Sequence, residues 1–333
     1  MSRTRPASAV VAVTGGSEGL GQLVYERLLR LASGELEVLT LGAQDPLLAT
    51  RLRRVSTLVH LATSYDVGAP AEERRALNVG GTQRVLAAAR RARVDRVVLS
   101  TSVEVYGVQP DNPIPLSEDA PLLAGPDHSL VGDHLEMESL AQQAIRDGIE
   151  VTVLRPAALV GGPLGSAYDG ALLRQLAGPR LLALRGSEPV WQLCHVEDLA
   201  AALEVAALGA VRGVATVACE GWLPQSRVER LSGRRRVELP PGVALSTAER
   251  LTRLGTSPAA PRELDRLLAP IVVASEQLRA AGWQPQWTNE AALLAHLATR
   301  PMRPTGAYTA AGATVAVVGT AALVRRARRR RRG

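Results

Sequence analysis

Glycines 15, 19 and 21 have the types and spacing of a turn that binds phosphate. They follow the apolar run at residues 9–13 and precede a segment with helical spacing of apolar residues. In such a turn the first glycine permits a tight bend, the second lets backbone N–H groups approach a pyrophosphate, and the third lets the helix pack closely on the strand. The helix N-terminus favours the anion. We therefore expect a dinucleotide pocket here, the alternative being an ordinary glycine-rich connection.

The elements that must position this turn alternate along most of the chain. Apolar runs at 9–13, 36–41, 57–62, 96–102, 150–156 and 190–196 predict strands, and helical patterns at 46–53, 71–92, 130–146 and 198–208 separate them. This alternation predicts an α/β, Rossmann-like, doubly wound parallel sheet. We expect a dinucleotide-binding domain over 1–165, to which 190–207 returns, a smaller substrate lobe over 166–300, a linker at 301–306 and a tail at 307–333.

The composition limits the partners and the compartment. Of the 39 basic residues seven follow Val324, so the preceding 32 arginines balance the 32 acidic residues, and no basic face for nucleic acid is expected. The two cysteines are too few for a disulfide scaffold and lack the spacing of metal ligands. No long apolar segment of a signal peptide opens the chain. We expect a folded protein of a reducing compartment, the cytoplasm, with no metal site.

Further motifs follow the glycine turn in a fixed order. They are HLA at 60–62, NVGGT at 78–82, STSVEVYG at 100–107, RP at 155–156, VGGP at 160–163, HVEDLA at 195–200 and GWQP at 282–285. This ordered set resembles the NAD-dependent epimerase/dehydratase family of extended short-chain dehydrogenase/reductases, over nearly all of residues 9 to 290. The ordered set is far more specific than any one of its motifs.

The resemblance implies a cofactor, NAD or NADP, and a small-molecule substrate such as a nucleotide sugar. The cofactor contacts it implies are Gly15, Ser17, Glu18, Gly19, Leu20, Gly21, Leu61, Ala62 and Ser100. By analogy alone it also implies a homodimer. Nothing in the variable lobe after Gly161 names the substrate.

The pair that does the family's chemistry is missing. In the family a tyrosine exchanges a proton with the substrate, and a lysine four residues later holds the nicotinamide ribose and lowers the pKa of that tyrosine. Here Leu130 falls at the tyrosine position and His134 at the lysine position. The chain contains no lysine at all, and no tyrosine is followed four residues later by a cation. Ser102 still matches the substrate-binding hydroxyl.

Two functional hypotheses follow from this loss. The chain is a catalytically impaired binding or regulatory module, or it is an active oxidoreductase or nucleotide-sugar epimerase of atypical mechanism. In the second case Ser102 works with His134, which can titrate near neutral pH, or with a group of the substrate. The missing lysine favours the first hypothesis.

The adenosine end of the cofactor site also departs from the family. An acid or an arginine is expected where the second strand ends, but the strand at 36–41 is followed by Gly42 and Ala43. The sequence of this strand and of the helix after it also resembles the third strand of the family and its helix more than the second. The span from Thr14 to His60 is short by one strand–helix unit, on the order of 20 to 25 residues. Either one βα unit is therefore missing, or the second strand lacks the acid or arginine that would bind the adenosine ribose.

The tail combines an apolar segment with arginines. Residues 307–324 are 18 residues without charge, and seven arginines lie within 325–332. As a helix the segment would be about 27 Å long, against a bilayer core of about 30 Å. Arginines can bind anionic headgroups, although a spanning tail would place them against the positive-inside tendency. Membrane association is favoured over a flexible tail, with spanning and surface binding both left open.

Overall fold

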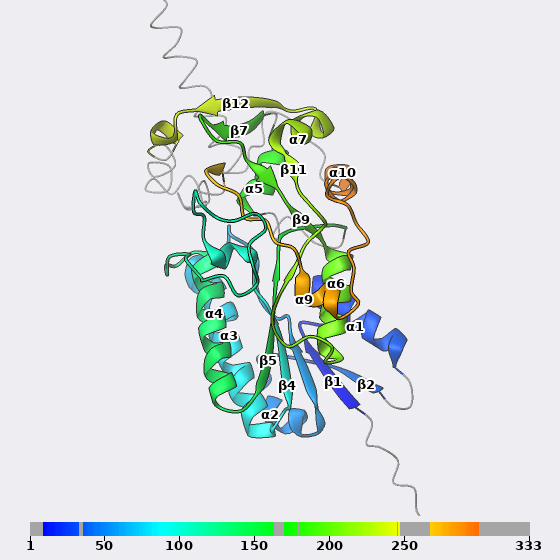
Figure 1. Ribbon diagram of the computed structural model, residues 1–333. Helices are drawn as coiled ribbons and strands as arrows, with labels where there is room; N and C mark the ends of the chain where they lie inside the picture. Colours follow the sequence, from blue (N-terminus) through cyan, green and yellow to red (C-terminus); the bar gives the residue numbers. More distant parts are fainter. Residues whose placement is uncertain are drawn as a thin grey trace, which may run out of the picture.

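The computed structural model describes residues 9–32, 36–162, 170–178, 180–244, 246 and 267–299. Its centre is a six-stranded parallel sheet with helices on both faces (Figure 1). The strand order is β10-β5-β4-β3-β1-β2. The bounds are β1 Ala9–Thr14, β2 Leu36–Leu41, β3 Thr57–His60, β4 Arg96–Ser100, β5 Glu150–Pro156 and β10 Gly213–Val217. The predicted Rossmann-like sheet is confirmed.

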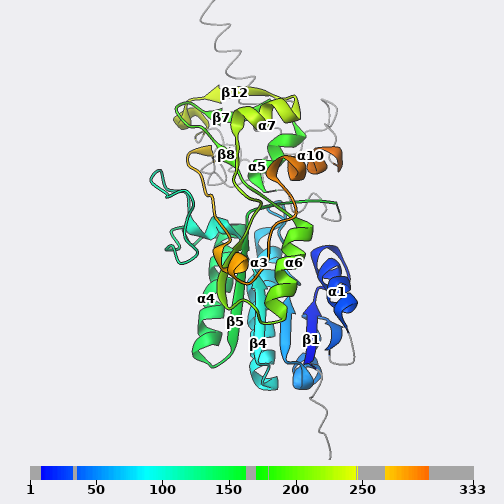
Figure 2. The ribbon, with the colours of Figure 1, turned by 45° about the vertical axis from the view of Figure 1, so that its right-hand side comes forward.

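Two helix pairs enclose this sheet. On one face lie α3 (Ala71–Ala92) and α4 (Leu130–Arg146), and on the other lie α1 (Gly19–Leu31) and α6 (Val196–Ala207), as Figures 1 and 2 show. The short α2 (Leu48–Arg51) and η1 (Leu52–Arg54) lead from β2 to β3. Arg27 of α1 pairs with Glu204 of α6 at 2.9 Å. The sheet is therefore covered on both sides, as a parallel sheet requires.

The apolar run of β1 shows why these strands are continuously hydrophobic. Side chains alternate between the two faces of a strand, so each face of β1 needs apolar residues. Val11 and Val13 belong to the core cluster that includes Leu20 and Val24 of α1. Val10 and Ala12 belong to the cluster on the α3 face. Two cores, one on each face, thus fix the end of β1 where the glycine turn begins.

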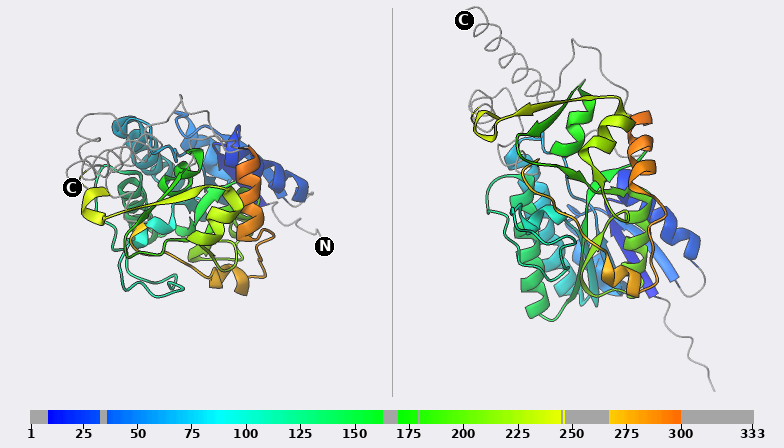
Figure 3. Two further views of the ribbon diagram at one scale, coloured as in Figure 1. Left: turned by 90° about the horizontal axis from the view of Figure 1, so that it is seen from above. Right: turned by 45° about the horizontal axis from the view of Figure 1, so that its top comes forward.

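Smaller elements lie over the carboxyl ends of the main sheet (Figure 3). Three two-stranded sheets pair β6 with β9, β7 with β12 and β8 with β11. Their strands are β6 Ala158–Val160, β7 Arg180–Leu184, β8 Val190–Trp191, β9 Leu193–His195, β11 Leu223–Pro224 and β12 Arg235–Leu239. The helices are η2 Val103–Tyr106, α5 Ala171–Arg174, η4 Gln175–Ala177, α7 Gln225–Ser232, α9 Glu276–Ala280 and α10 Asn289–Thr299.

The predicted elements at 36–41, 71–92, 130–146 and 150–156 have the predicted bounds, and the others differ at their ends or are divided. Predicted helices 71–92 and 130–146 coincide with α3 and α4. The single strand predicted at 190–196 is instead β8 and β9, because its two halves pair with different partners, β8 with β11 and β9 with β6. The Gln192 side chain between them bonds to the oxygen of Val273 at 2.8 Å and to its nitrogen at 2.9 Å. In addition β10, which the sequence alone places in the smaller lobe, pairs with β5 in the main sheet. The proposed division into domains otherwise stays a prediction.

The sheet is one strand short beside β1. In a Rossmann sheet of order 3-2-1-4-5-6, two strands lie on the far side of the first. Here β2 alone lies there, paired with β1 from Ala9↔Leu36 to Thr14↔Leu41. β2 lies at the second position of that order, and no strand lies at the third position among the described residues. One βα unit is therefore missing, as the short span from Thr14 to His60 predicts.

The tail prediction falls outside the described residues. Residues 301–333, which hold the apolar segment and its arginines, are not among them. Among the residues that are, no helix is both long enough and apolar enough to cross a bilayer. Membrane association through the tail therefore stays a prediction.

Candidate functional site

The glycine turn is pressed between the carboxyl ends of β1 and β3. Gly15 has a φ of +75°, and a Cβ at this position would lie 2.8 Å from Leu61 O and Ala62 N. A Cβ at Gly21 would lie 1.9 Å from Gly15 O. Only glycine fits at either position, since such distances are far below van der Waals contact. The structure thus brings together four of the predicted cofactor residues, from two strand ends and one helix.

The N-terminus of α1 is open to an anion. The helix begins at Gly19, and its N-cap residue, Glu18, makes no side-chain cap hydrogen bond. The first N–H groups of a helix have no partner within the helix, so they suit a phosphate. Ser17 and Glu18 are exposed at this end, whereas Leu20 is 2% exposed and can contribute only its backbone. The residues of the turn therefore fit the phosphate end of a dinucleotide.

A separate cavity of about 280 Å³ lies beyond the ends of β4 and β5. Ser102, Leu130 and His134 all line it, so the predicted substrate hydroxyl and the two altered catalytic positions share one space. Tyr65 lines it as well. None of residues 14–21 does. The predicted site thus consists of two parts, the glycine turn and the cavity.

Ser102 is placed to donate a hydrogen bond into the cavity. It is the N-cap of η2, and its hydroxyl oxygen accepts the N–H of Glu104 at 3.2 Å. A hydroxyl that accepts in this way keeps its own hydrogen for another partner. The neighbouring Thr101 donates its hydroxyl to Glu138 of α4 at 2.8 Å. Glu138 in turn forms a buried ion pair with Arg155 of β5, at 2.5 Å, so the strand end that carries Ser102 is tied to α4 and β5.

His134 is uncharged in this environment. Burial, with a smaller effect of the nearby Arg74 guanidinium, lowers the pKa of His134 to about 3. Its side chain is 1% exposed, and neither ring nitrogen has a hydrogen-bond partner among the described residues. A neutral imidazole offers one donor and one acceptor, but no positive charge. His134 therefore does not replace the charge of the missing lysine.

The start of α4 fixes where His134 lies. Ser129 caps the helix, accepting the N–H of Gly132 at 3.2 Å. A Cβ at Gly132 would lie 1.9 Å from Asp127 O, so the preceding loop packs directly on the first helical turn. His134 follows in the next turn and faces the cavity. The local sequence thus directs an imidazole to the wall of the cavity.

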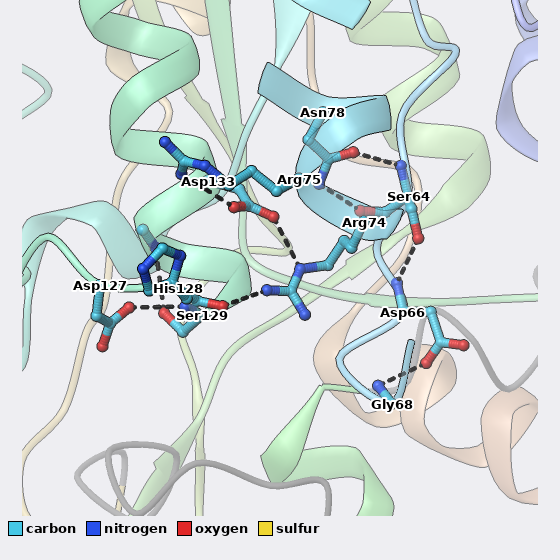
Figure 4. A network of polar contacts seen from close by, with 11 residues as sticks. Ser64, Asp66, Gly68, Arg74, Arg75, Asn78, Asp127, His128, Ser129 and Asp133 are labelled. Carbon is cyan, nitrogen blue, oxygen red and sulfur yellow. Dashed lines mark hydrogen bonds and ion pairs between the residues drawn. The ribbon is translucent and has the colours of Figure 1, made fainter. Parts of the chain in front are cut away.

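Two residues of α3, one turn apart, bind the segments that carry Tyr65 and His134 (Figure 4). Arg74 donates to the Asp133 carboxylate at 2.8 Å and to His128 O at 2.5 Å. Asn78 accepts the N–H of Ser64 at 2.7 Å and donates to Ser64 O at 2.9 Å. Asp133 precedes His134 and Ser64 precedes Tyr65. Both cavity side chains are therefore held from the same face of α3.

Tyr65 is a site residue that the sequence did not indicate. Its hydroxyl donates to Ser100 Oγ at 2.8 Å. Its ring centre is 5.5 Å from that of His134, with the ring planes tilted by 59°. No motif covers residue 65, and its only sequence signal is an aromatic residue shortly after the third strand. Ser100, a predicted cofactor residue, is 1% exposed and contacts Tyr65.

Comparison with known sequences gives one family and several relatives. A profile of the NAD dependent epimerase/dehydratase family matches residues 11–215. An uncharacterized protein of Mycobacterium tuberculosis is 31% identical over 280 residues, which are 81% of this chain and 73% of the relative. A 4-hydroxy-2-methyl-3-oxo-4-farnesyl-3,4-dihydroquinoline-1-oxide ketoreductase of Stigmatella aurantiaca is 29% identical over 215 residues, 59% of this chain and 63% of that protein.

Comparison with solved structures gives the same fold. UDP-glucose 4-epimerase from Thermotoga maritima, solved with UDP-glucose, has a TM-score of 0.65 at 17% identity and covers 87% of this chain and 98% of its own. UDP-glucose 4-epimerase from Thermus thermophilus, in complex with NAD, has a TM-score of 0.60 at 18% identity, with the same coverage. At these identities the likeness concerns the fold alone.

Proposed function

This chain belongs to the NAD dependent epimerase/dehydratase family, and from that premise we propose that it is a nucleotide-binding member without the family's proton-transfer chemistry. The observation that carries the proposal is the cavity wall, where Leu130 and an uncharged His134 stand at the tyrosine and lysine positions. Leucine carries no transferable proton. The protein then acts as a binding or regulatory module.

The family and its NAD-bound structural neighbours support a cofactor of the NAD type. When bound, such a dinucleotide supplies a hydride donor or acceptor. We propose that the glycine turn holds the pyrophosphate of NAD or NADP and that the adenosine end is weakly anchored. Asp45, the first acid after β2, is engaged by Arg51 at 2.8 Å and accepts the N–H of Leu47 at 2.8 Å. It is therefore a poor substitute for the usual ribose acceptor.

A small molecule is the proposed ligand of the cavity. Solved relatives bind UDP-glucose or UDP-N-acetylmuramic acid. For this chain we propose a ligand with an oxygen that can accept a hydrogen bond, because Ser102 keeps its hydrogen for such a partner. A homodimer is proposed from analogy with the family alone. Binding of the tail to a membrane is proposed from the sequence of the tail alone.

A second candidate function is an active oxidoreductase of atypical mechanism. Ser102 faces the cavity, and the similarity to a ketoreductase, at 29% identity, favours a carbonyl substrate. The weakness of this candidate is the base. With a pKa of about 3, His134 accepts protons poorly at neutral pH, so a group of the substrate would have to do so.

Binding and turnover measured on the full chain separate the two functions. We expect NADH or NADPH to bind, as measured by calorimetric titration, with no hydride transfer to nucleotide sugars or to simple ketones such as cyclohexanone. Turnover with any of these acceptors would contradict the first function and support the second. Failure of NADH, NADPH and ADP to bind would contradict nucleotide binding itself.

A further inference from the structure

We infer that the Tyr65 ring takes the space of the nicotinamide riboside, so that the chain in this conformation binds the ADP part of a dinucleotide but gains nothing from the nicotinamide part. The inference rests on the proposed nucleotide binding and identifies which part of the ligand the site accepts. It concerns a disagreement within one site, since the glycine turn fits a dinucleotide and the cavity end does not.

The contacts of Tyr65 define the space that it fills. Its hydroxyl is 2.8 Å from Ser100 Oγ, and its ring centre is 5.5 Å from that of His134. Ser100 is a predicted cofactor residue, and position 134 is where the family resemblance places the group that holds the nicotinamide ribose. Because the Tyr65 ring lies beside both side chains, it would overlap with a ribose that extends from one to the other.

The backbone around Tyr65 is fixed by its own hydrogen bonds. Asn78 binds both the N–H and the carbonyl of Ser64, at 2.7 and 2.9 Å. The Ser64 hydroxyl accepts the N–H of Asp66 at 3.2 Å, and Asp66 accepts the N–H of Gly68 at 2.7 Å. This chain of bonds holds the loop on either side of Tyr65. Moving the ring would require breaking its bond to Ser100 within a loop that is otherwise held in place.

The cavity is consistent with this assignment. Tyr65 lines the cavity, whereas residues 14–21 of the glycine turn do not. The ring therefore lines the cavity while its hydroxyl contacts Ser100 at the end of β4. The other group that would favour a nicotinamide ribose, a cation at position 134, is replaced by an imidazole that burial keeps neutral. The nicotinamide end therefore lacks both its space and its anchor.

Calorimetric titration of the full chain with ADP and with NADH tests the assignment. For the wild-type protein we expect NADH to bind no more tightly than ADP. In Tyr65→Ala the space opens, so NADH should bind roughly tenfold more tightly, while ADP binding stays the same. Tyr65→Phe is the matched control, because it removes the bond to Ser100 but keeps the ring, and it should resemble the wild type.

The outcomes separate this inference from the function on which it rests. Binding of ADP with a strong wild-type preference for NADH, unchanged or weakened in Tyr65→Ala, overturns the inference and leaves nucleotide binding intact. Equal gains in Tyr65→Ala and Tyr65→Phe overturn the role of the ring in favour of the hydrogen bond. Absence of ADP binding in all three proteins overturns nucleotide binding and the inference together. The pair 2′-phospho-ADP and NADPH provides the same comparison for a phosphorylated ribose.

Discussion

Arg74 of α3 and Asp133 of α4 form an ion pair at 2.8 Å in which the side chains are only 4% and 0% exposed. A charge buried in this way is stable only with its partner, since water no longer solvates it. The pair joins the two helices beside the cavity, and the Arg74 charge contributes to the low pKa of His134. One contact thus serves both the fold and the electrostatics of the site.

Removing one member of this pair should destabilise the protein strongly. Arg74→Met leaves the Asp133 carboxylate buried without its main partner, at an expected cost of about 3–5 kcal/mol in the free energy of unfolding. Arg90→Met is the matched control, because it removes an ion pair with Asp147 whose side chains are 63% and 27% exposed. That change should cost at most about 1 kcal/mol. Equal costs in urea denaturation would show that burial of the Arg74 pair has no special role.

The glycine turn should tolerate no side chain at position 21. In Gly21→Ala the new Cβ meets Gly15 O at 1.9 Å, so the turn or the helix must shift. We expect loss of ADP binding and a decrease of about 1–3 kcal/mol in the free energy of unfolding. Gly178→Ala is the control, because a Cβ there has its nearest neighbour at 3.6 Å. Calorimetry with ADP and urea denaturation measure the two effects, and undiminished ADP binding by Gly21→Ala would contradict the assigned phosphate site.

Most of the fold and part of the site follow from the sequence. Periodicity located α3 and α4, because long amphipathic helices bury one regular face. The turn at Gly15 and Gly21 was also evident, since its chemistry lies in consecutive residues. Tyr65 was missed because its role depends on Ser100 and His134, which are 35 and 69 residues further along the chain and meet it only in the folded protein. The neutrality of His134 was missed for the same reason, as burial is a property of the fold.

Two buried histidines should make the protein sensitive to acid. Burial is the main cause that lowers the pKa of His60 to about 4 and that of His134 to about 3, from 6.5 in the unfolded chain. Between the folded-state and the unfolded-state pKa of each histidine, the unfolded chain binds a proton that the folded chain does not. Stability is therefore fully present above pH 6.5 and decreases as the pH falls toward 4, by up to about 1.4 kcal/mol per pH unit for each histidine.

Urea denaturation over a series of pH values measures this dependence. His134→Leu removes one of the two titrating groups, so its stability should decrease less steeply with acid than that of the wild type. His128→Leu, at an exposed position, is the control for replacing a histidine by leucine. A slope in His134→Leu as steep as that of the wild type would show that His134 is not kept neutral in the folded protein.

Restoring the family's lysine should harm this protein. In His134→Lys an ammonium group would be buried at a position that is 1% exposed, near the Arg74 guanidinium that already helps to lower the pKa of His134. Burial and a like charge both disfavour the charged form, so the pKa of the new lysine should lie below its usual value of about 10.4. Its folded-state pKa is then lower than in the unfolded chain, so the variant gains stability relative to the wild type as the pH rises from about 7 toward 10.

At neutral pH we expect His134→Lys to lose several kcal/mol in the free energy of unfolding, as for a buried charge without a partner. The exposed His128→Lys should lose little and show no such pH dependence. Wild-type stability of His134→Lys at neutral pH would mean that the site still accommodates a cation and would contradict the view that burial at position 134 disfavours a charged group.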